Sequence, residues 1–499
     1  MEGKDNIVMF PFMAQGHINP FLSLALHLHS LHPHLTITFV NTPRNISTLQ
    51  HSFPPSRRLL FRSLPFLSSQ HPGLPPDVEN TDSLPYPLVI RLLQASLSLR
   101  PSFARLLQEL VHDSRGSGSV CVVADIFFGW TAPLARELGV FHAVFCGTSG
   151  YGLACYYSIW RSLPHRSTDA EEFLLEDFRE ASIIHVTQLP LTISEADGSD
   201  PWSLFQEHNL SAWSASNAIL FNSVSEFDEV GFEYFRRKLG VKVWPVGPVF
   251  LPQGSSGSSG EERCLEWLDT KKERSVLYIS FGTMNTISLS HMMELALALE
   301  SSGKDFIWVV RPPMGFDITS EFRGDEWLPK GFEERVGKSG KGLLVRTWAP
   351  QVKILSHRAL SVFLTHCGWN SVLEALSHGV PMLGWPMAAE QFFNTKLLEE
   401  RMGVCIEFVR GKTCKIHHEE LRAKIETVMG DTERGRGVRR RAEEAMEVLR
   451  DAIRVGKDGS KGSSLKGLEE FMSAATTKEG GLANGNGNGN KNNGSHQGS

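Results

Sequence analysis

The sequence predicts an α/β protein made of two domains, each built around a parallel sheet. Two observations carry this prediction. Apolar runs of strand length alternate with helical patterns from residue 7 to residue 221, and a second series of the same kind runs from residue 276 to residue 384. At about 150 residues per domain, the 499 residues allow three domains, or two large ones. The cleft between two such domains is the expected ligand site.

The first series begins with a strand, a turn and a helix. Ile7–Phe12 is a short apolar run, and Gln15–His17 contains a glycine that favours a turn. The apolar residues between 21 and 28 then recur at helical spacing, and the β-branched run Leu35–Val40 completes a βαβ unit. Further strands are predicted at Val120–Ala124, Ala143–Cys146 and Ile219–Phe221, and the Pro- and Ser-rich stretch Phe53–Pro87 is predicted to be a long loop.

The second series begins after about residue 265 and repeats the alternation. A helix is expected around Leu289–Ser301, and helical patterns separate the later apolar runs. The predicted strands are Val276–Ser280, Phe306–Arg311, Gly342–Arg346, Ser361–Thr365 and Val380–Gly384.

The break between the two series defines the domain boundaries. We predict domains at residues 1–248 and 264–455, joined by a linker at 249–263. This linker contains the repeat GSSGSSG (254–260), which is typical of a flexible expression linker and indicates an engineered segment; a natural low-complexity loop is the alternative. Residues 456–476 are predicted to form a C-terminal helix that packs back on the first domain, and residues 477–499 to be a disordered tail.

Composition and charge exclude several classes of protein. Apolar residues make up 41% and charged residues 21%, which excludes collagen-like, coiled-coil and wholly disordered chains. The formal net charge is −5 and the basic run Arg434–Arg441 is short, so we expect no binding to nucleic acid. The seven cysteines show no CxxC spacing, and we find no signal peptide and no apolar run of membrane-spanning length. We therefore expect a cytoplasmic protein with no metal site.

Most of the chemical signal lies in Trp348–Gln391. Within it, Ser361–Thr365 is a predicted strand, and His366–Ser371 is a turn that contains a glycine and opens a helix. Free N–H groups at a helix start, beside the polar side chains of this turn, can bind a diphosphate. Three residues further along the helix, Glu374 could accept hydrogen bonds from a ribose, and Trp348 offers a flat face for a base.

This segment, with THCGWNS, GVP, WP and EQ in register, resembles the signature of plant secondary-product glycosyltransferases. FPFMAQGHINP near the start, CLEWLD at Cys264–Asp269 and LYISFGT at Leu277–Thr283 are also typical of that family. The resemblance covers about residues 5–470 and implies the GT-B fold, in which two Rossmann-like domains face a cleft. It further implies an acceptor-binding first domain, a second domain that binds a UDP-sugar co-substrate, and no cofactor.

The resemblance also assigns donor-binding roles residue by residue. Trp348 would stack on uracil, the backbone of Ala349 and the side chain of Gln351 would bind the base and ribose edge, and Glu374 would bind the ribose hydroxyls. Phosphate contacts are implied for His366, Asn370, Ser371, Ser280 and Thr283. Glu390 and Gln391 would hold sugar hydroxyls, and glutamine at this place is associated with glucose. Trp369 is included in the donor set, although core packing is the favoured role for it, because buried tryptophan mostly fills cores.

His17 and Asp125 form the predicted catalytic pair. Both lie at the carboxyl ends of predicted parallel strands, where α/β sheets place ligands. A neutral imidazole can take the proton of an acceptor hydroxyl, and the family's aspartate partner would hold the imidazole tautomer and stabilise the imidazolium. The alternatives are a turn residue for His17 and a helix N-cap for Asp125. The resemblance implies a single displacement with inversion, which gives a β-glucoside.

The acceptor pocket is expected among the variable loops of the first domain. Aromatic and apolar residues there suit a flat phenolic or terpenoid acceptor, although core packing would also explain them. The candidates are Phe12, Phe127, Phe128 and Tyr151, with the loops 85–90 and 193–202. In many relatives a threonine that contacts the sugar follows the strand after the catalytic aspartate; here Gly147 takes that place, and Thr148 is a candidate one position later.

The function expected from these residues is UDP-glucose-dependent O-glucosylation of small lipophilic plant metabolites: flavonoid or phenolic aglycones, terpenoid aglycones, or their glycosides. One alternative keeps the fold and uses UDP-galactose, UDP-xylose or UDP-glucuronate. The other is a catalytically silent small-molecule binding protein, which the joint presence of His17 and Asp125 disfavours. We expect a monomer.

Overall fold

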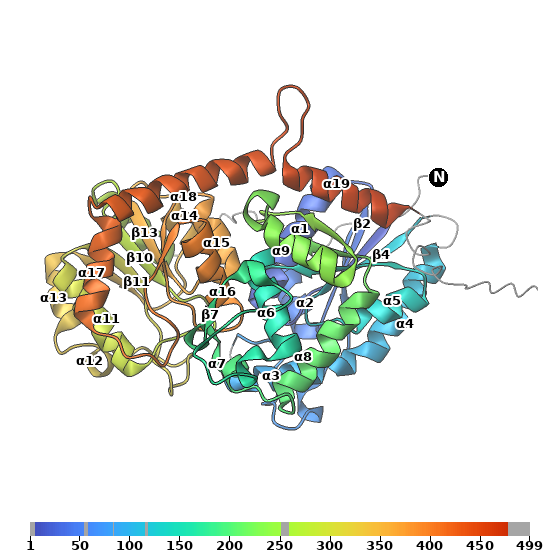
Figure 1. Ribbon diagram of the computed structural model, residues 1–499, viewed down its shortest axis with the longest axis horizontal. Helices are drawn as coiled ribbons and strands as arrows, with labels where there is room; N and C mark the ends of the chain where they lie inside the picture. The colour runs from blue at the N-terminus through green and yellow to red at the C-terminus, as the bar shows by residue number, and fades with distance from the viewer. Residues whose placement is uncertain (1–4, 54–57, 83, 115–117, 251–258, 478–499) are drawn as a thin grey trace, which may run out of the picture.

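The computed structural model of the protein describes residues 5–53, 58–82, 84–114, 118–250 and 259–477. Within these ranges the chain forms two lobes, each built on a twisted parallel sheet with helices around it (Figure 1). Residues 251–258 and 478–499, which contain most of the Gly-Ser repeat and nearly all of the predicted tail, lie outside the described residues. The two-sheet α/β prediction is confirmed.

The first lobe contains a seven-stranded sheet in the order β3-β2-β1-β4-β5-β8-β9, and every neighbouring pair is parallel. Its strands are β1 (Asn6–Phe10), β2 (Thr36–Asn41), β3 (Leu59–Ser63), β4 (Val120–Asp125), β5 (Phe141–Cys146), β8 (Ala218–Phe221) and β9 (Lys242–Pro245). A small antiparallel pair, β6 (Glu172–Phe173) and β7 (Ile184–His185), lies apart from this sheet.

The second lobe contains a six-stranded parallel sheet in the order β12-β11-β10-β13-β14-β15. Its strands are β10 (Val276–Ser280), β11 (Asp305–Val309), β12 (Gly342–Val345), β13 (Leu360–Thr365), β14 (Met382–Gly384) and β15 (Cys405–Glu407). Strand order reverses between β10 and β13, and such a reversal in a parallel sheet opens a crevice at the carboxyl ends of the strands.

Helices cover both faces of the sheets because alternate strand residues point to opposite sides. Along β1, Ile7 and Met9 enter one apolar cluster while Val8 and Phe10 enter another. The helices of the first lobe are α1 (Gln15–Leu31), α2 (Pro43–Ser52), α3 (Val89–Ser96), α4 (Arg100–Ser114), α5 (Thr131–Glu137), α6 (Gly150–Ser162), α7 (Leu191–Ser194), α8 (Pro201–Ala212) and α9 (Ser225–Leu239).

The later helices complete the second lobe and return to the first. They are α10 (Ser259–Asp269), α11 (Leu289–Ser302), α12 (Gly324–Trp327), α13 (Phe332–Ser339), α14 (Gln351–Leu355), α15 (Trp369–Leu376), α16 (Gln391–Lys396), α17 (His418–Met429), α18 (Glu433–Ala452) and α19 (Ser463–Thr476). Short 3-10 turns are η1 (Ser68–Gln70), η2 (Tyr86–Leu88), η3 (Leu97–Leu99), η4 (Pro164–Arg166), η5 (Arg179–Ala181), η6 (Val186–Gln188) and η7 (Trp213–Ala215), and η8 (Leu397–Arg401) is a π-helical turn.

Two features hold the lobes together. Helix α18 runs along the second lobe, and α19 continues over the first lobe, where Leu468 and Phe471 enter the cluster beneath β1 (Figure 1). Helix α16 of the second lobe packs against α6 of the first, and a continuous apolar cluster contains Phe221 from one lobe and Trp369 from the other. The interface behind the cleft is therefore largely apolar, which favours one relative placement of the lobes.

Two local predictions were wrong. The turn after β1 ends earlier than expected, so that α1 already begins at Gln15 and His17 lies in its first turn. The stretch 53–87, predicted as loop, contains β3, whose Leu59 pairs with Ile37 of β2 at the sheet edge. Among the described residues, we find no helix with the length and apolar character that crossing a membrane would require.

The contact between α6 and α9 depends on Gly231. A Cβ atom on this residue would lie 2.1 Å from the carbonyl carbon of Gly150. We expect Gly231→Ala to force the two helices apart and to lower the free energy of unfolding by about 1–3 kcal/mol. Thermal unfolding measures this change as a lower Tm.

Gly337→Ala is the matched control, because Gly337 lies in helix α13 and a Cβ there would meet no atom within 4 Å. This change should leave Tm unchanged or raise it, since alanine is the better helix former. Equal Tm values for the two variants would contradict the close packing of α6 on α9.

Candidate active site

A cleft of about 740 Å³ separates the two lobes at the carboxyl edges of their sheets. Most of the residues predicted for catalysis or donor binding line it. From the first lobe these are Phe12, His17, Phe127 and Thr148, and from the second Ser280, Thr283, Trp348, Ala349, Gln351, His366, Trp369, Asn370, Ser371, Glu374, Glu390 and Gln391. Residues that lie more than 350 positions apart in the chain thus face a common space.

His17 and Asp125 contact each other at the carboxyl edge of the sheet in the first lobe. His17 lies in the first turn of α1, and Asp125 is the last residue of the adjacent strand β4. His17 Nδ1 lies 2.9 Å from Asp125 Oδ2. Since a carboxylate only accepts, Nδ1 carries the proton and donates it, which leaves the lone pair of a neutral imidazole on Nε2. The other carboxylate oxygen, Oδ1, accepts the N–H of Phe127 at 3.0 Å, so Asp125 is held from two sides.

The surroundings of His17 change its basicity. Burial alone would lower the pKa of His17, but the negative charge of Asp125, the hydrogen bond to it and the more distant charge of Glu390 together raise the pKa above its usual value. The His17 side chain is 29% exposed and that of Asp125 is 1% exposed. The imidazole is thus open to the cleft and backed by a fully buried carboxylate, an arrangement that suits a general base.

The turn before α15 is shaped around His366. Cβ atoms on Gly282 and Gly368 would lie 2.9 Å and 2.4 Å from atoms of the His366 ring, so both glycines allow backbone to approach the imidazole. Burial lowers the pKa of His366 to about 4, and the charge of Lys412 acts in the same direction. His366 is therefore neutral at pH 7, and it can offer an N–H to an anion without carrying positive charge itself.

Gln351, Ser371 and Glu374 form one hydrogen-bonded group on the second lobe. Gln351 Nε2 donates to Ser371 Oγ at 3.0 Å and to Glu374 Oε2 at 2.7 Å. Burial raises the pKa of the Glu374 carboxyl, while the Gln351 hydrogen bond lowers it. Trp348 is 72% exposed beside this group, so a flat face is open to a planar ligand next to carboxylate and amide oxygens. This arrangement can bind a nucleoside.

Polar contacts join the two lobes, two of them between cleft residues and one, Ser149 to Asn394, buried beside the cleft. Thr148 Oγ1 donates to Glu390 Oε1 at 3.0 Å, Ser149 Oγ to Asn394 Oδ1 at 2.7 Å, and Asn370 Nδ2 to the carbonyl of Gly16 at 3.1 Å. Gln391 uses its carbonyl oxygen to accept the N–H groups of Met387 and Ala388, and its Nε2 donates no hydrogen bond to any described residue, so it can serve another acceptor. Glu390, Thr148 and Gln391 thus line the cleft together with His17 and the nucleoside-binding group.

Phe128 and Tyr151, predicted for the acceptor pocket, lie outside the cleft. Phe128 is fully buried and packs on Phe10, 4.4 Å between ring centroids, and Tyr151 is buried with its hydroxyl donating to the carbonyl of Ala181. Both are core residues: Phe128 belongs to the apolar cluster that contains Phe10, and Tyr151 to the one that contains Phe221. Trp369 reaches the cleft, yet it is 2% exposed and its indole N–H donates to the carbonyl of Asn222, which holds the lobes together.

Several cleft residues were not singled out from the sequence. Tyr86 and Trp202 fall within the loops predicted for the acceptor pocket, whereas Asp82, Asn285 and Arg311 were not predicted. Arg311 follows β11 at the carboxyl edge of the sheet, a position that could have marked it. Asp82 carried no comparable signal, because it lies in an irregular segment. Within the described ranges, no group of three or more His, Cys, Asp or Glu residues is placed to hold a metal ion.

Comparison with known proteins agrees with this geometry. The family model "UDP-glucoronosyl and UDP-glucosyl transferase" matches residues 260–438, and the model "Glycosyltransferase, N-terminal domain" matches residues 5–249. UDP-glycosyltransferase 92A1 of Arabidopsis thaliana is 51% identical over 480 residues, which cover 95% of this chain and 97% of that protein. Crocetin glucosyltransferase 3 of Crocus sativus is 39% identical over 472 residues, with coverage of 92% and 97%.

Solved structures give the same result. The glycosyltransferase UGT73P12 of Glycyrrhiza uralensis, complexed with glycyrrhetinic acid 3-O-monoglucuronide, is 29% identical with a TM-score of 0.79 and coverage of 95% of this chain and 96% of that one. UGT2 of Phytolacca americana, complexed with UDP-2-fluoro-glucose and pterostilbene, is 26% identical with a TM-score of 0.74 and coverage of 95% and 99%. The family resemblance and the fold predicted from the sequence are confirmed.

The contact between His17 and Asp125 makes a prediction for pH dependence. If neutral His17 is the base, kcat/KM should rise with pH through a pKa above the usual value of about 6.5. In Asp125→Asn the charge that raises this pKa is gone, so the rise should move to lower pH, and kcat should fall about 100-fold or more. Rates of both proteins against pH measure the two effects.

Glu390→Gln is the comparison variant, because the charge of Glu390 raises the pKa of His17 less than Asp125 does. Its pH profile should shift in the same direction by a smaller amount. A profile in Asp125→Asn with the wild-type pKa would show that His17 is not the titrating group.

Proposed function

The chain belongs to the plant UDP-glycosyltransferases, enzymes that transfer sugar from a UDP-sugar to small metabolites, and we propose that it transfers glucose from UDP-glucose to a hydroxyl group of a lipophilic acceptor with inversion. The observation that carries this proposal is the hydrogen bond between His17 and Asp125 on one wall of a cleft whose other wall holds the nucleoside-binding group.

The proposed chemistry is a single displacement. The acceptor hydroxyl gives its proton to Nε2 of His17 as its oxygen attacks the anomeric carbon of the sugar. The bond between that carbon and the β-phosphate oxygen breaks, and its electron pair leaves with UDP. Asp125 stabilises the imidazolium that forms and fixes the ring orientation through Nδ1. Attack from the face opposite to the departing UDP converts an α-linked donor into a β-glucoside.

Glucose is the proposed sugar because the polar side chains that line the cleft with His17 and the nucleoside-binding group suit a ring of hydroxyl groups. Glu390 can accept hydrogen bonds from two hydroxyls, Gln391 can donate from its free amide, and Thr148 fixes the carboxylate of Glu390 from the opposite lobe. Two of the similar proteins support this choice: one is named a glucosyltransferase, and another was solved with a UDP-glucose analogue.

A flat, lipophilic acceptor suits the region around His17. The ring of Phe12 lies 5.7 Å and that of Phe127 5.4 Å from the imidazole, centroid to centroid. Tyr86, Val89 and Trp202 also line the cleft. Aromatic walls bind planar apolar rings by burying area and by stacking, and they leave the reacting hydroxyl to be oriented by His17.

The proposed base predicts a separation of binding from catalysis. In His17→Ala, sugar transfer should fall about 10²- to 10⁴-fold, because the proton acceptor is lost. The affinity for UDP should stay close to wild type, since the proposed donor contacts come from the second lobe. Product formation followed by mass spectrometry and UDP binding followed by calorimetry test the two parts. Turnover at the wild-type rate would exclude His17 as the base.

The proposed donor predicts a ranking among UDP-sugars. With one acceptor, UDP-glucose should give a kcat/KM about tenfold or more above UDP-galactose, UDP-xylose and UDP-glucuronate, because each differs in a group that Glu390 and Gln391 would contact. A higher kcat/KM with any of the other three UDP-sugars would contradict the assignment of glucose as the donor sugar. It would leave the assignment of His17 and Asp125 unaffected.

A further inference from the structure

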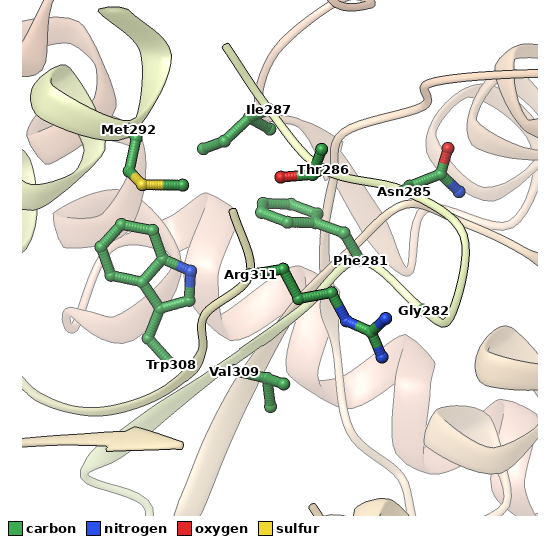
Figure 2. A pocket seen from close by; sticks show the side chains of 9 residues that line it. All are labelled: Phe281, Gly282, Asn285, Thr286, Ile287, Met292, Trp308, Val309 and Arg311. Carbon is green, nitrogen blue, oxygen red and sulfur yellow. The ribbon is translucent and has the colours of Figure 1, made fainter. Parts of the chain in front are cut away.

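Two cationic side chains, Arg311 and Lys412, hydrogen-bond the loop after β10. It runs from Phe281 to Ile287, lines the cleft at Gly282, Thr283 and Asn285, and covers a small cavity of about 10 Å³. Figure 2 shows the guanidinium of Arg311 near Gly282, with Asn285 further along the same loop. Arg311 Nη1 donates to the carbonyl of Thr283 at 2.7 Å, and Lys412 Nζ donates to Asn285 Oδ1 at 3.2 Å.

Neither cation has an acidic partner at ion-pair distance among the described residues. Burial lowers the pKa of Lys412 to about 8 and also lowers that of Arg311, although the more distant charge of Asp82 raises the latter. Lys412 further lies 5.5 Å from the centroid of the Tyr86 ring. Both side chains are half-buried, and a half-buried cation without an acidic partner at ion-pair distance is unfavourable, so this pair is suited to a ligand that brings negative charge.

The same loop contacts the predicted phosphate-binding turn. Gly282 lies against the imidazole of His366, as the position of a Cβ there shows, and the charge of Lys412 is close enough to lower the pKa of His366. His366 is neutral and adds no positive charge, whereas Arg311 and Lys412, which hydrogen-bond this loop, do. Arg311 itself lines the cleft, whereas Lys412 acts through the amide of Asn285, whose Nδ2 donates no hydrogen bond within the described part of the chain.

We propose that Arg311 and Lys412 are positioning residues that supply the positive charge for the diphosphate of the donor and for UDP as it departs. This inference rests on the proposed function in using UDP as the leaving group. When the bond between the anomeric carbon and the β-phosphate oxygen breaks, the electron pair stays on that oxygen and the charge on the diphosphate increases. Two fixed cations behind the loop stabilise this increase, and the acceptor proton goes separately to His17.

Binding of UDP, UMP and uridine to the protein alone tests this role. In Lys412→Met and Arg311→Met, calorimetry should show UDP affinity reduced about tenfold or more, UMP affinity reduced less, and uridine affinity unchanged. Unchanged uridine affinity also shows that each variant is folded. Lys412→Arg and Arg311→Lys should restore most of the UDP affinity. Lys415→Met is the control, because Lys415 lies three residues along and is exposed.

Two results would overturn the proposal. The first is UDP affinity at the wild-type level in both methionine variants. The second is a loss of the same factor for uridine as for UDP, which would mean that the side chains only hold the loop in shape. Neither result depends on His17, the acceptor or the sugar. The binding test therefore stays valid even if His17 is not the base or glucose is not the donor sugar.

Discussion

The site depends on one constraint, the parallel arrangement of both sheets. Because every strand of the two main sheets runs in the same direction as its neighbours, the residues that follow the strands gather at a single edge of each sheet. In the first lobe that edge brings α1 with His17 beside the end of β4 with Asp125. In the second it brings the loop after β10 against the turn after β13. The apolar interface behind the cleft then sets the two edges face to face.

Charge is divided between the walls of the cleft according to the chemistry that each would perform. The first lobe places a buried carboxylate behind an imidazole, which raises the pKa of the imidazole and favours a base. The second lobe places a neutral His366 in front of two cations, where burial and Lys412 lower the imidazole pKa. Histidine therefore has a raised pKa on one wall and a lowered pKa on the other, because the neighbouring charges and the burial of the two imidazoles differ. A chain with a net charge of −5 can still present local positive charge to an anionic donor.

Hydrophobic periodicity predicted the fold, and sequence motifs predicted the donor-binding segment. Both kinds of pattern can be read from neighbouring residues in the sequence. Val276–Ser280 was predicted with the bounds that the structure has, and His17 and Asp125 could be paired from their places after strands. Non-local features could not be predicted. Whether an aromatic residue such as Tyr151 faces a core or a cleft depends on which helix covers it, and β3 is a strand because β2 offers it an edge. Arg311 and Lys412 lie about 100 residues apart, and both hydrogen-bond the loop after β10.

The anomeric configuration of the product tests the central claim most directly. In the proposed mechanism the acceptor oxygen gives its proton to His17 and displaces UDP in one step. Proton NMR of the purified product should then show only the β-glucoside, identified by the large coupling between the axial protons at C1 and C2. A product with the α configuration would require retention through two displacements or a front-face attack. That result would contradict the catalytic arrangement of His17, Asp125 and the donor wall.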